Sequence, residues 1–222
     1  RRSEDRGDPR TTGGARLKKR SVPKHPFRDG RFGTDPRSGR GGMPRHKTQT
    51  AERPGNRRAD GIRTARENLP AITIYTDGSA LGNPGPGGYG AVLLAGPHRK
   101  ELSQGYRLTT NNRMELTGVC AALEALRFDG SEVVIYSDSK YVVDAVTKGW
   151  VFGWEKKGFA GKKNPDLWRR FLRAYRRHHV RFVWVKGHAE TVENNRCDFL
   201  AVAAANDAAH RIEDTGYEAE GR

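Results

Sequence analysis

The sequence predicts an α/β fold in which a mixed β-sheet is covered by helices. Three β-rich segments come first, close enough in the chain to form an antiparallel meander. Helical and β-rich patterns then alternate as far as residue 207, which is typical of strands added in parallel. A change of composition at Pro70 separates this part of the 222-residue chain from a basic extension.

The meander is expected from three segments of β-forming residues. Residues 72–76 alternate between apolar and polar side chains and run into Asp77. A loop rich in Gly and Pro is expected over residues 82–90. Residues 91–94 and 102–108 then predict the second and third strands.

A long helix is expected next, capped by Thr110 or Asn111. Its apolar residues recur at helical spacing: Leu116, Val119, Cys120, Leu123 and Leu126. The later elements are predicted as strands at 132–136 and 180–185 and as helices at 140–149, 166–179 and 192–207.

Residues 1–70 hold 20 Lys and Arg against 8 Asp and Glu, a net charge of +12, and their only aromatic residues are Phe27 and Phe32. Because so little apolar surface cannot offset the entropy lost on ordering, we expect a disordered extension. Residues 71–222 hold 21 basic and 18 acidic residues and all the Trp and Tyr, and we expect them to form one domain.

The charge of the extension predicts sequence-independent binding to nucleic acid, with an affinity that falls steeply with salt. A plain solvated extension is the alternative. No run of about 18 apolar residues occurs, so no membrane span is expected, and the extension lacks the apolar centre of a secretory signal. The two cysteines are too few for a disulfide scaffold, which favours a reducing, cytoplasmic location.

Acidic residues stand at the ends of several expected elements. Asp77 and Asp138 end strands, Glu115 lies in the first turns of the long helix, and Asp198 lies on the last helix. One such acid alone is usually a turn residue, but adjacent strands of one sheet bring their ends together. Clustered carboxylates repel one another unless some are protonated or a cation neutralises them.

Ligand sets made only of oxygen suit Mg²⁺ or Mn²⁺ and not Zn²⁺. Two such ions about 3.5–4 Å apart can activate a water molecule and stabilise the leaving oxygen of a phosphodiester. The acidic residues therefore predict metal-dependent hydrolysis of a phosphodiester.

Two other motifs are set aside. Residues 85–90 match the G-x-G-x-x-G pattern of dinucleotide-binding folds, but that motif opens a helix and a strand is expected here. Cys197 and His188 could form a nucleophile pair, yet Cys197 lies within a helical pattern and is more simply a buried thiol.

A series of residue blocks, in this order and at these separations, resembles bacterial-type ribonuclease HI over about residues 71–217. The blocks are Thr76-Asp77-Gly78-Ser79, Gly82–Gly90, Thr109–Leu116, Ser137-Asp138-Ser139, Val185–Ala189, Asn194–Asp198 and Glu213–Tyr217. The resemblance implies a ribonuclease H-like fold, with a five-stranded sheet of three antiparallel strands followed by parallel ones.

The resemblance also implies endonucleolytic cleavage of RNA paired to DNA, which leaves 5′-phosphate and 3′-hydroxyl ends. Two Mg²⁺ ions would serve the reaction, and Mn²⁺ could substitute. Asp77 and Asp138 would hold both ions, Glu115 one ion and Asp198 the other. His188 would assist proton transfer or product release, as an imidazole can near neutral pH, although a lone loop histidine is otherwise usually only solvated.

The resemblance assigns Asn83, Asn111 and Asn112 to minor-groove contacts with the two strands, where the 2′-hydroxyl identifies RNA. Thr110 would hold a DNA phosphate, and Lys140 could add a phosphate contact. Each asparagine could instead only cap a helix or form a turn.

A basic and aromatic stretch between Trp150 and Arg181 corresponds to the family's basic protrusion, which is thought to hold the DNA strand. It contains Trp150, Trp154, Phe159 and Trp168 together with Lys156, Lys157, Lys162, Lys163, Arg169 and Arg170. This mixture suits a face that grips a nucleic-acid backbone. The alternative is a helix that buries its aromatic residues. The stretch is short for the family, and the basic extension could compensate.

Two other functions stay open. A module that binds hybrids without cutting them would gain nothing from clustered acids, and a resolvase- or integrase-like nuclease would lack the block over residues 110–115. A folded hybrid-binding domain in the extension is not expected, because it has no Trp or Tyr for stacking. We expect a monomer whose partner is an RNA–DNA hybrid duplex.

Overall fold

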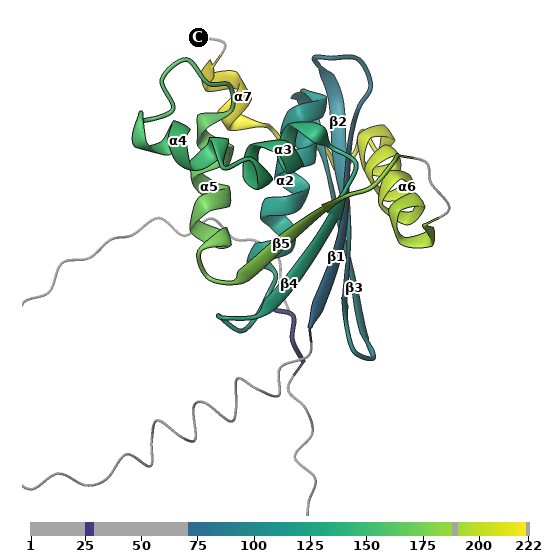
Figure 1. Ribbon diagram of the computed structural model, residues 1–222. Helices are drawn as coiled ribbons and strands as arrows, with labels where there is room; N and C mark the ends of the chain where they lie inside the picture. Colours follow the sequence, from purple (N-terminus) through teal and green to yellow (C-terminus); the bar gives the residue numbers. More distant parts are fainter. Residues whose placement is uncertain (1–24, 29–70, 188–190, 221–222) are drawn as a thin grey trace, which may run out of the picture.

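The structure, a computed structural model, describes residues 25–28, 71–187 and 191–220 (Figure 1). Its centre is one five-stranded sheet with the strand order β3-β2-β1-β4-β5. Strands β1 (Ile72–Ala80), β2 (Gly85–Ala95) and β3 (His98–Thr109) form an antiparallel meander. Strands β4 (Glu132–Ser137) and β5 (His179–Trp184) extend the sheet in parallel with β1. The predicted mixed sheet is therefore confirmed.

Helices cover both faces of the sheet (Figure 1). Helix α6 (Val192–Asn206) packs on one face against β1, β2 and β3. Helix α2 (Asn111–Glu124) packs against β1 and β2 and is backed by α5 (Pro165–Tyr175). Helix α3 (Lys140–Thr147) follows β4 and contacts both β4 and β5.

Two boundaries differ clearly from the prediction. Strand β2 begins at Gly85, within the expected loop, and α5 ends at Tyr175 because the chain must turn before β5 begins at His179. Two short helices were not predicted as separate elements: α4 (Trp150–Lys156) and α7 (Thr215–Glu220).

Glycine belongs in β2 because α6 lies directly on that strand. A Cβ atom on Gly88 would stand 2.6 Å from the carbonyl oxygen of Ala201, and one on Gly90 would overlap the carbonyl oxygen of Cys197. The residues that looked like a loop are therefore a strand stripped of side chains where a helix backbone meets it. This also confirms that the G-x-G-x-x-G pattern does not open a helix here.

The core lies between the sheet and α2, α3 and α5. Two aromatic residues of the basic stretch, for which a nucleic-acid face and burial were both open, belong to this core: Trp168 is fully buried and Phe159 is 4% exposed. Trp168 points inward because α5 presents its apolar side to α2, and its indole N–H donates to the hydroxyl of Tyr141 at 2.8 Å. For these two residues, packing decides the side-chain position.

Four residues within the extension, 25–28, pack on the domain, and Phe27 is 1% exposed. The expectation of disorder along the whole of residues 1–70 does not hold for this segment. Its single large aromatic side chain fills a place in the core, which is the condition that the rest of the composition does not meet.

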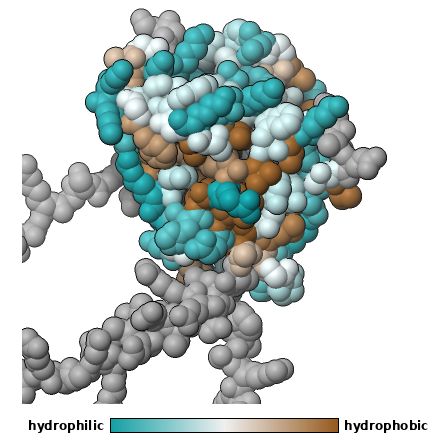
Figure 2. All heavy atoms as spheres, in the orientation of Figure 1, coloured by the Kyte–Doolittle hydropathy of each residue, from teal (hydrophilic) through white to brown (hydrophobic). Residues whose placement is uncertain are grey.

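On the face shown in Figure 2, hydrophilic residues surround an apolar area. Among the described residues, the large apolar side chains that remain exposed include Trp150 and Trp184, each almost half exposed. Within the described residues, no helix has both the length and the apolar character needed to cross a membrane.

The contact between α6 and β2 generates a stability prediction. We expect Gly90→Ala to lower the free energy of unfolding by about 3 kcal/mol, because the added methyl group has to displace the backbone of α6. Gly153→Ala in α4 is the matched control, since nothing lies within 4 Å of the new atom. It should raise stability by about 0.5–1 kcal/mol. Urea unfolding of both variants measures the difference, and equal stability would contradict the close packing.

Candidate active site

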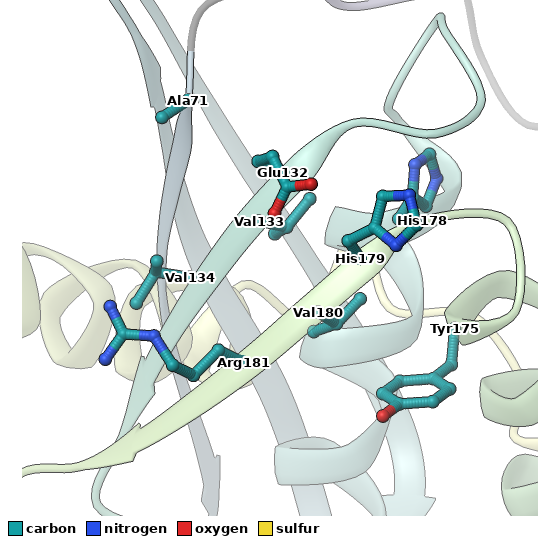
Figure 3. Close-up of a pocket in the computed structure, with 9 residues that line it drawn as sticks. All are labelled: Ala71, Glu132, Val133, Val134, Tyr175, His178, His179, Val180 and Arg181. Atoms are coloured by element: carbon teal, nitrogen blue, oxygen red, sulfur yellow. The ribbon is translucent and has the colours of Figure 1, made fainter.

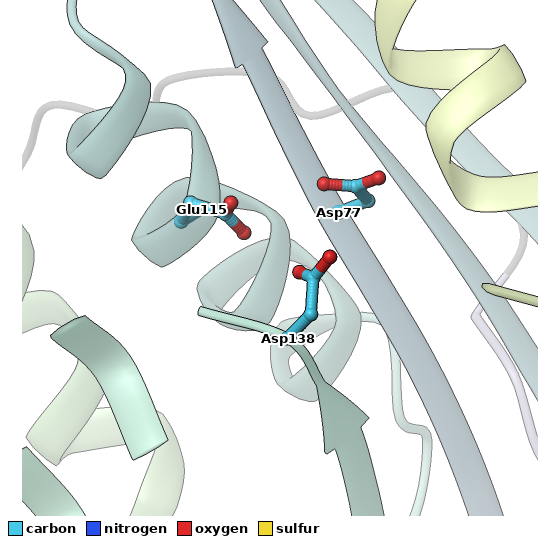
Figure 4. A group of neighbouring side chains, drawn as sticks. All are labelled: Asp77, Glu115 and Asp138. Carbon is cyan, nitrogen blue, oxygen red and sulfur yellow. The ribbon is translucent and has the colours of Figure 1, made fainter. Parts of the chain in front are cut away.

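Three carboxylates from separate elements meet at one end of the sheet (Figure 4). Asp77 lies in β1, Glu115 in α2, and Asp138 directly after β4. One oxygen atom from each lies within 4.8 Å of the other two. Three of the four predicted metal ligands are therefore neighbours.

The sheet brings the two aspartates together. Strands β1 and β4 are parallel neighbours, and Thr76 is paired with Ser137. Asp77 and Asp138 each follow one member of this pair, so the two strands carry them to the same edge. This is the edge at which open α/β sheets usually bind ligands.

Glu115 reaches the aspartates because α2 lies against β1 with no side chain between them. Gly78 follows Asp77, and a Cβ atom there would stand 2.5 Å from the carbonyl carbon of Met114 and 2.8 Å from the Cα atom of Glu115. Only glycine leaves room for this approach. The Asp-Gly pair therefore supplies one carboxylate and admits the helix that carries another.

The loop that carries Asp138 is held by its neighbours in β5. The indole N–H of Trp184 donates to the carbonyl oxygen of Asp138 at 3.1 Å, and the backbone N–H of Val185 donates to that of Ser137 at 3.1 Å. Sequence reasoning did not single out Trp184. The available signal was an aromatic residue at the end of the strand beside β4.

The carboxyl group of Glu115 is under electrostatic strain. The residue is 6% exposed, and its Oε2 atom has no hydrogen-bond partner among the described residues. Burial, and then the charges of Asp77 and Asp138, raise the pKa of Glu115 well above its usual range. The backbone N–H of Gly78 acts in the opposite direction. The site therefore lacks positive charge.

A divalent cation fits this deficit. The donors are all carboxylate oxygens, which Mg²⁺ and Mn²⁺ prefer, and the buried oxygen of Glu115 needs a partner. Oxygens that share one Mg²⁺ ion are at most about 4.2 Å apart, twice the usual bond length. The three carboxylates therefore form a possible metal-binding cluster, and small side-chain adjustments would suffice to hold an ion.

The remaining two catalytic predictions are not part of this cluster. Asp198 lies half-buried on α6 and is not among the three carboxylates that lie within 4.8 Å of one another. It is nevertheless close to the site, because Cys197 packs on Gly90, the cross-strand partner of Asp77. His188 lies outside the described residues, which resume at Thr191. Both roles stay predictions.

A polar hollow of about 680 Å³ gathers five of the eleven residues predicted to contact nucleic acid. It is lined by Asn83, Pro84, Thr110, Asn112, Lys162, Lys163, Asn164, Pro165 and Tyr217. Thr110 makes no side-chain hydrogen bond to cap α2, so capping does not account for its hydroxyl group. Tyr217, near the end of the chain, was not predicted to lie here.

Asn111 joins this hollow to the carboxylates. Its backbone N–H donates to the side-chain oxygen of Asn83 at 3.2 Å, so Asn83 caps α2 from a different loop. Asn111 and Glu115 are four residues apart on one helix, which places them on the same side about 6 Å apart along the axis. Contacts made at the start of α2 are therefore fixed relative to the acidic cluster.

A buried ion-pair network holds the start of α2. Arg113 is 1% exposed, and its guanidinium group pairs with Asp214 and Asp166, each at 2.7 Å. The hydroxyl of Thr109 also donates to Asp214 at 2.6 Å. The network ties α2 to α5 and to the segment before α7. No separate sequence pattern indicates this network: Thr109, Arg113 and Asp214 lie within the residue blocks given above, and Asp166 does not.

The basic and aromatic stretch is only partly a surface. Trp150 is 48% exposed, and Lys148 lies over its ring at 4.9 Å. Lys162 lies over the ring of Trp154 at 5.3 Å, while Trp154 also packs on the core. The predicted lysines of this stretch are exposed: Lys156, Lys157, Lys162 and Lys163. Two of its four aromatic residues therefore remain candidates for contact with nucleic acid.

Lys140 lies at the start of α3, beside the acidic cluster. Its ammonium group stands over the ring of Trp184 at 5.3 Å. Trp184 also donates to the carbonyl oxygen of Asp138. A cation and an exposed aromatic ring therefore border the loop that carries one of the carboxylates.

A second pocket, shown in Figure 3, lies at the other end of the parallel strands. Its lining includes Ala71, which precedes β1, and the first residues of β4 and β5, Glu132 and His179. Burial lowers the pKa of His178, which also lines it. This pocket contains none of the residues predicted to act in catalysis.

The charge deficit at Glu115 generates a stability prediction. Without divalent ions at neutral pH, Glu115→Gln should raise the free energy of unfolding by about 1–2 kcal/mol, because it removes a buried charge that two aspartates repel. Melting in EDTA measures this change. Mg²⁺ should then raise the melting temperature of the parent protein more than that of the variant. A variant that melts below the parent in EDTA would contradict the proposed repulsion.

Comparison with known proteins agrees with the geometry. The family model for RNase H matches residues 70–206. The Ribonuclease H of Syntrophus aciditrophicus is 52% identical over 162 residues, which cover 71% of this chain and 92% of that protein. The Ribonuclease H of Pectobacterium atrosepticum is 55% identical over 154 residues, which cover 67% of this chain and 97% of that protein.

The fold is also found among solved structures. The crystal structure of LC9-RNase H1, described as a type 1 RNase H with the type 2 active-site motif, aligns with a TM-score of 0.58 at 32% identity. The alignment covers 69% of this chain and 82% of that one. Together with the matching family model, these similarities show that the chain belongs to the RNase H family and has the ribonuclease H-like fold.

Proposed function

We propose that this protein is a metal-dependent endonuclease that hydrolyses the RNA strand of RNA–DNA hybrids. The observation that carries the proposal is the meeting of Asp77, Glu115 and Asp138 at one edge of an RNase H fold. A protein that only binds a polyanion would be weakened by three clustered negative charges. An enzyme that recruits divalent cations to a phosphodiester needs these negative charges to bind the cations.

Two Mg²⁺ ions, or Mn²⁺ in their place, would activate a water molecule and stabilise the leaving oxygen when bound. Asp77 and Asp138 would hold both ions, Glu115 would hold one, and Asp198 would complete the other position from α6. Trp184 would keep the Asp138 peptide in place through its hydrogen bond to the carbonyl oxygen. The products would carry 5′-phosphate and 3′-hydroxyl ends.

His188 would accept or deliver the proton that hydrolysis requires, or assist release of the product. Its place between Gly187 and the start of α6 supports this role in one respect. Gly187 lies so near to Asp138 that an added Cβ atom would contact its carboxylate. The chain that leads to His188 therefore passes beside the acidic cluster.

The polar hollow supports recognition of both strands. Thr110 would hold a phosphate of the DNA strand, helped by the charge of Lys162 and Lys163. Asn83, Asn111 and Asn112 would read the minor groove, where the 2′-hydroxyl marks RNA. Because α2 carries both the asparagines and Glu115, strand recognition and metal binding would share one rigid element.

The exposed part of the basic stretch would grip the flanking duplex. Trp150 and Trp154, each paired with a lysine, offer flat faces and positive charge next to the hollow. Lys156 and Lys157 would add charge to the same grip, and Lys140 would contact a phosphate near the cleavage site.

We further propose a monomer, with residues 71–222 as the catalytic domain and the basic extension as an additional nucleic-acid contact. A reducing, cytoplasmic environment remains the prediction from the two cysteines, Cys120 and Cys197, which are free and buried.

The test is cleavage of strand-labelled duplexes. With Mg²⁺, the protein should cut RNA in an RNA–DNA hybrid and leave RNA–RNA and DNA–DNA duplexes intact, and EDTA should stop the reaction. Asp138→Asn should lower the rate by at least about 10²–10³-fold while hybrid binding is retained. Asp129→Asn is the control, because this exposed acid pairs with Arg177 away from the cluster.

The other outcomes separate the rival functions. A hybrid that is bound but left intact under every metal condition would identify a binding module. Cleavage of DNA would favour a resolvase- or integrase-like nuclease. Activity that survives Asp138→Asn would remove the acidic cluster from the mechanism.

A separate prediction concerns the extension. If residues 1–70 bind the duplex, their deletion should weaken hybrid affinity and flatten its dependence on salt, because fewer counterions are then released on binding. Titration of labelled hybrid at about 50 to 200 mM salt measures how steeply the affinity of each protein falls with salt concentration. An unchanged slope would show that the extension does not touch nucleic acid.

A further inference from the structure

A four-residue segment of the extension is built into the domain. The backbone N–H of Arg28 donates to the carbonyl oxygen of Ala125 at 2.9 Å, and that of Arg127 donates to Pro26 at 2.8 Å. These bonds form an antiparallel bridge between Phe27 and Leu126, just after α2 ends. The pairing is backbone to backbone on both sides, so it fixes the direction of the segment.

Side chains secure the same segment. The ring of Phe27 is 1% exposed and belongs to the same buried cluster as Leu126, which is fully buried. The ring of His25 lies 4.6 Å from that of His98 in β3. The ammonium group of Lys100, also in β3, donates to the carbonyl oxygen of Arg28. Contacts with β3 and with the end of α2 thus form one socket.

The socket lies far from the acidic cluster. Leu126 follows Glu115 by eleven residues, which corresponds to about 16 Å along the helix axis. In Figure 1 the segment is the short purple stretch near the end of the sheet where β1 begins. The carboxylates stand where β1 and β4 end. The extension is therefore attached at the end of the domain opposite to the cleavage site.

The attachment divides the extension into two basic stretches. Residues 1–24 hold 9 Lys and Arg against 3 Asp and Glu, and residues 29–70 hold 10 against 5. The second stretch lies between Arg28 and Ala71, both of which the structure describes. Fixing residues 25–28 on the domain costs chain entropy. Burial of Phe27 and the paired backbone bonds offset that cost.

We propose that His25–Arg28 is a docking motif, and that its socket holds the two basic stretches at the end of the domain opposite to the carboxylates. From there they contact the phosphate backbone of the duplex that flanks the cleavage site. The family match begins at residue 70, so the domain supplies the socket while the motif lies outside the matched part. The contact with the duplex rests on the proposed function, and the docking of residues 25–28 does not.

Nucleic acid is the partner that the composition favours. Both stretches combine excess Arg and Lys with Gly and Pro, and neither contains Trp or Tyr. Such a chain can neutralise phosphates without reading bases. Phe32, the other aromatic residue of the extension, lies outside the described residues.

The first test compares Phe27→Ala with Phe32→Ala in the full chain. Phe27→Ala should lower the melting temperature by several degrees and speed tryptic cleavage after Lys24 and Arg28 by about tenfold or more, because the segment is released. Phe32→Ala, the same change four residues past the segment, should leave both unchanged. Phe27→Leu keeps an apolar side chain and should fall between the parent and Phe27→Ala. Equal cleavage in all four proteins would overturn the docking motif.

The second test concerns the duplex. A short hybrid and the same hybrid flanked by duplex DNA are titrated with each protein. The gain in affinity from the flanks should fall about threefold or more in Phe27→Ala, because the basic stretches are less concentrated near the duplex. It should be unchanged in Phe32→Ala. An equal gain in all proteins would overturn the positioning role. If the protein cut no hybrid at all, the melting and proteolysis results would still decide the docking.

Discussion

Contact between α2 and β1 without an intervening side chain is the constraint on which the site depends. Gly78 allows the helix backbone to lie on the strand, and this brings Glu115 beside Asp77. The parallel pairing of β1 with β4 then adds Asp138. The result is a cluster of charges that repel one another and that the rest of the fold must hold together. The repulsion among the carboxylates lowers the stability of the fold, and the proposed binding of cations would offset it.

The structure compensates with a second cluster, in which the charges are matched. Arg113 lies two residues before Glu115 and donates hydrogen bonds to Asp166, Asp214 and the side-chain oxygen of Asn164. Burial of a lone guanidinium group would be costly, but here the hydrogen bonds are satisfied on several sides. One turn of α2 therefore carries both Glu115, whose charge is not balanced, and Arg113, whose charge is. The ion pairs of Arg113 anchor this turn.

Much of the fold could be predicted from the sequence, because β1 and β4 alternate regularly, α2 carries apolar residues at helical spacing, and α6 is rich in alanine. The prediction of a loop over the glycine-rich part of β2 was wrong. The rule that glycine favours turns takes no account of the helix that lies on this strand. For Phe159 and Trp168 the sequence left a surface position and burial both open, for a related reason. An aromatic residue between lysines looks exposed until its partners in other elements are known.

The site shows the same division. Residues that end strands or begin helices could be placed from local pattern, which is why Asp77, Glu115 and Asp138 were predicted together. Tyr217 and Trp184 could not, because each reaches the site through contacts between elements distant in the chain. Phe27 is the clearest case. Composition predicts disorder along the whole extension, but for residues 25–28 one buried side chain outweighs the average of its neighbours.

The ion pair between Arg113 and Asp214 limits where the C-terminal part of the chain can be truncated. Asp214 lies directly before α7, the helix that ends the described part of the chain. Removing it would leave a buried cation with half its partners, directly beneath the turn that carries the asparagines and Glu115. A tag attached after α7 should therefore be tolerated better than a truncation before Asp214, although the C-terminal end looks suitable for shortening.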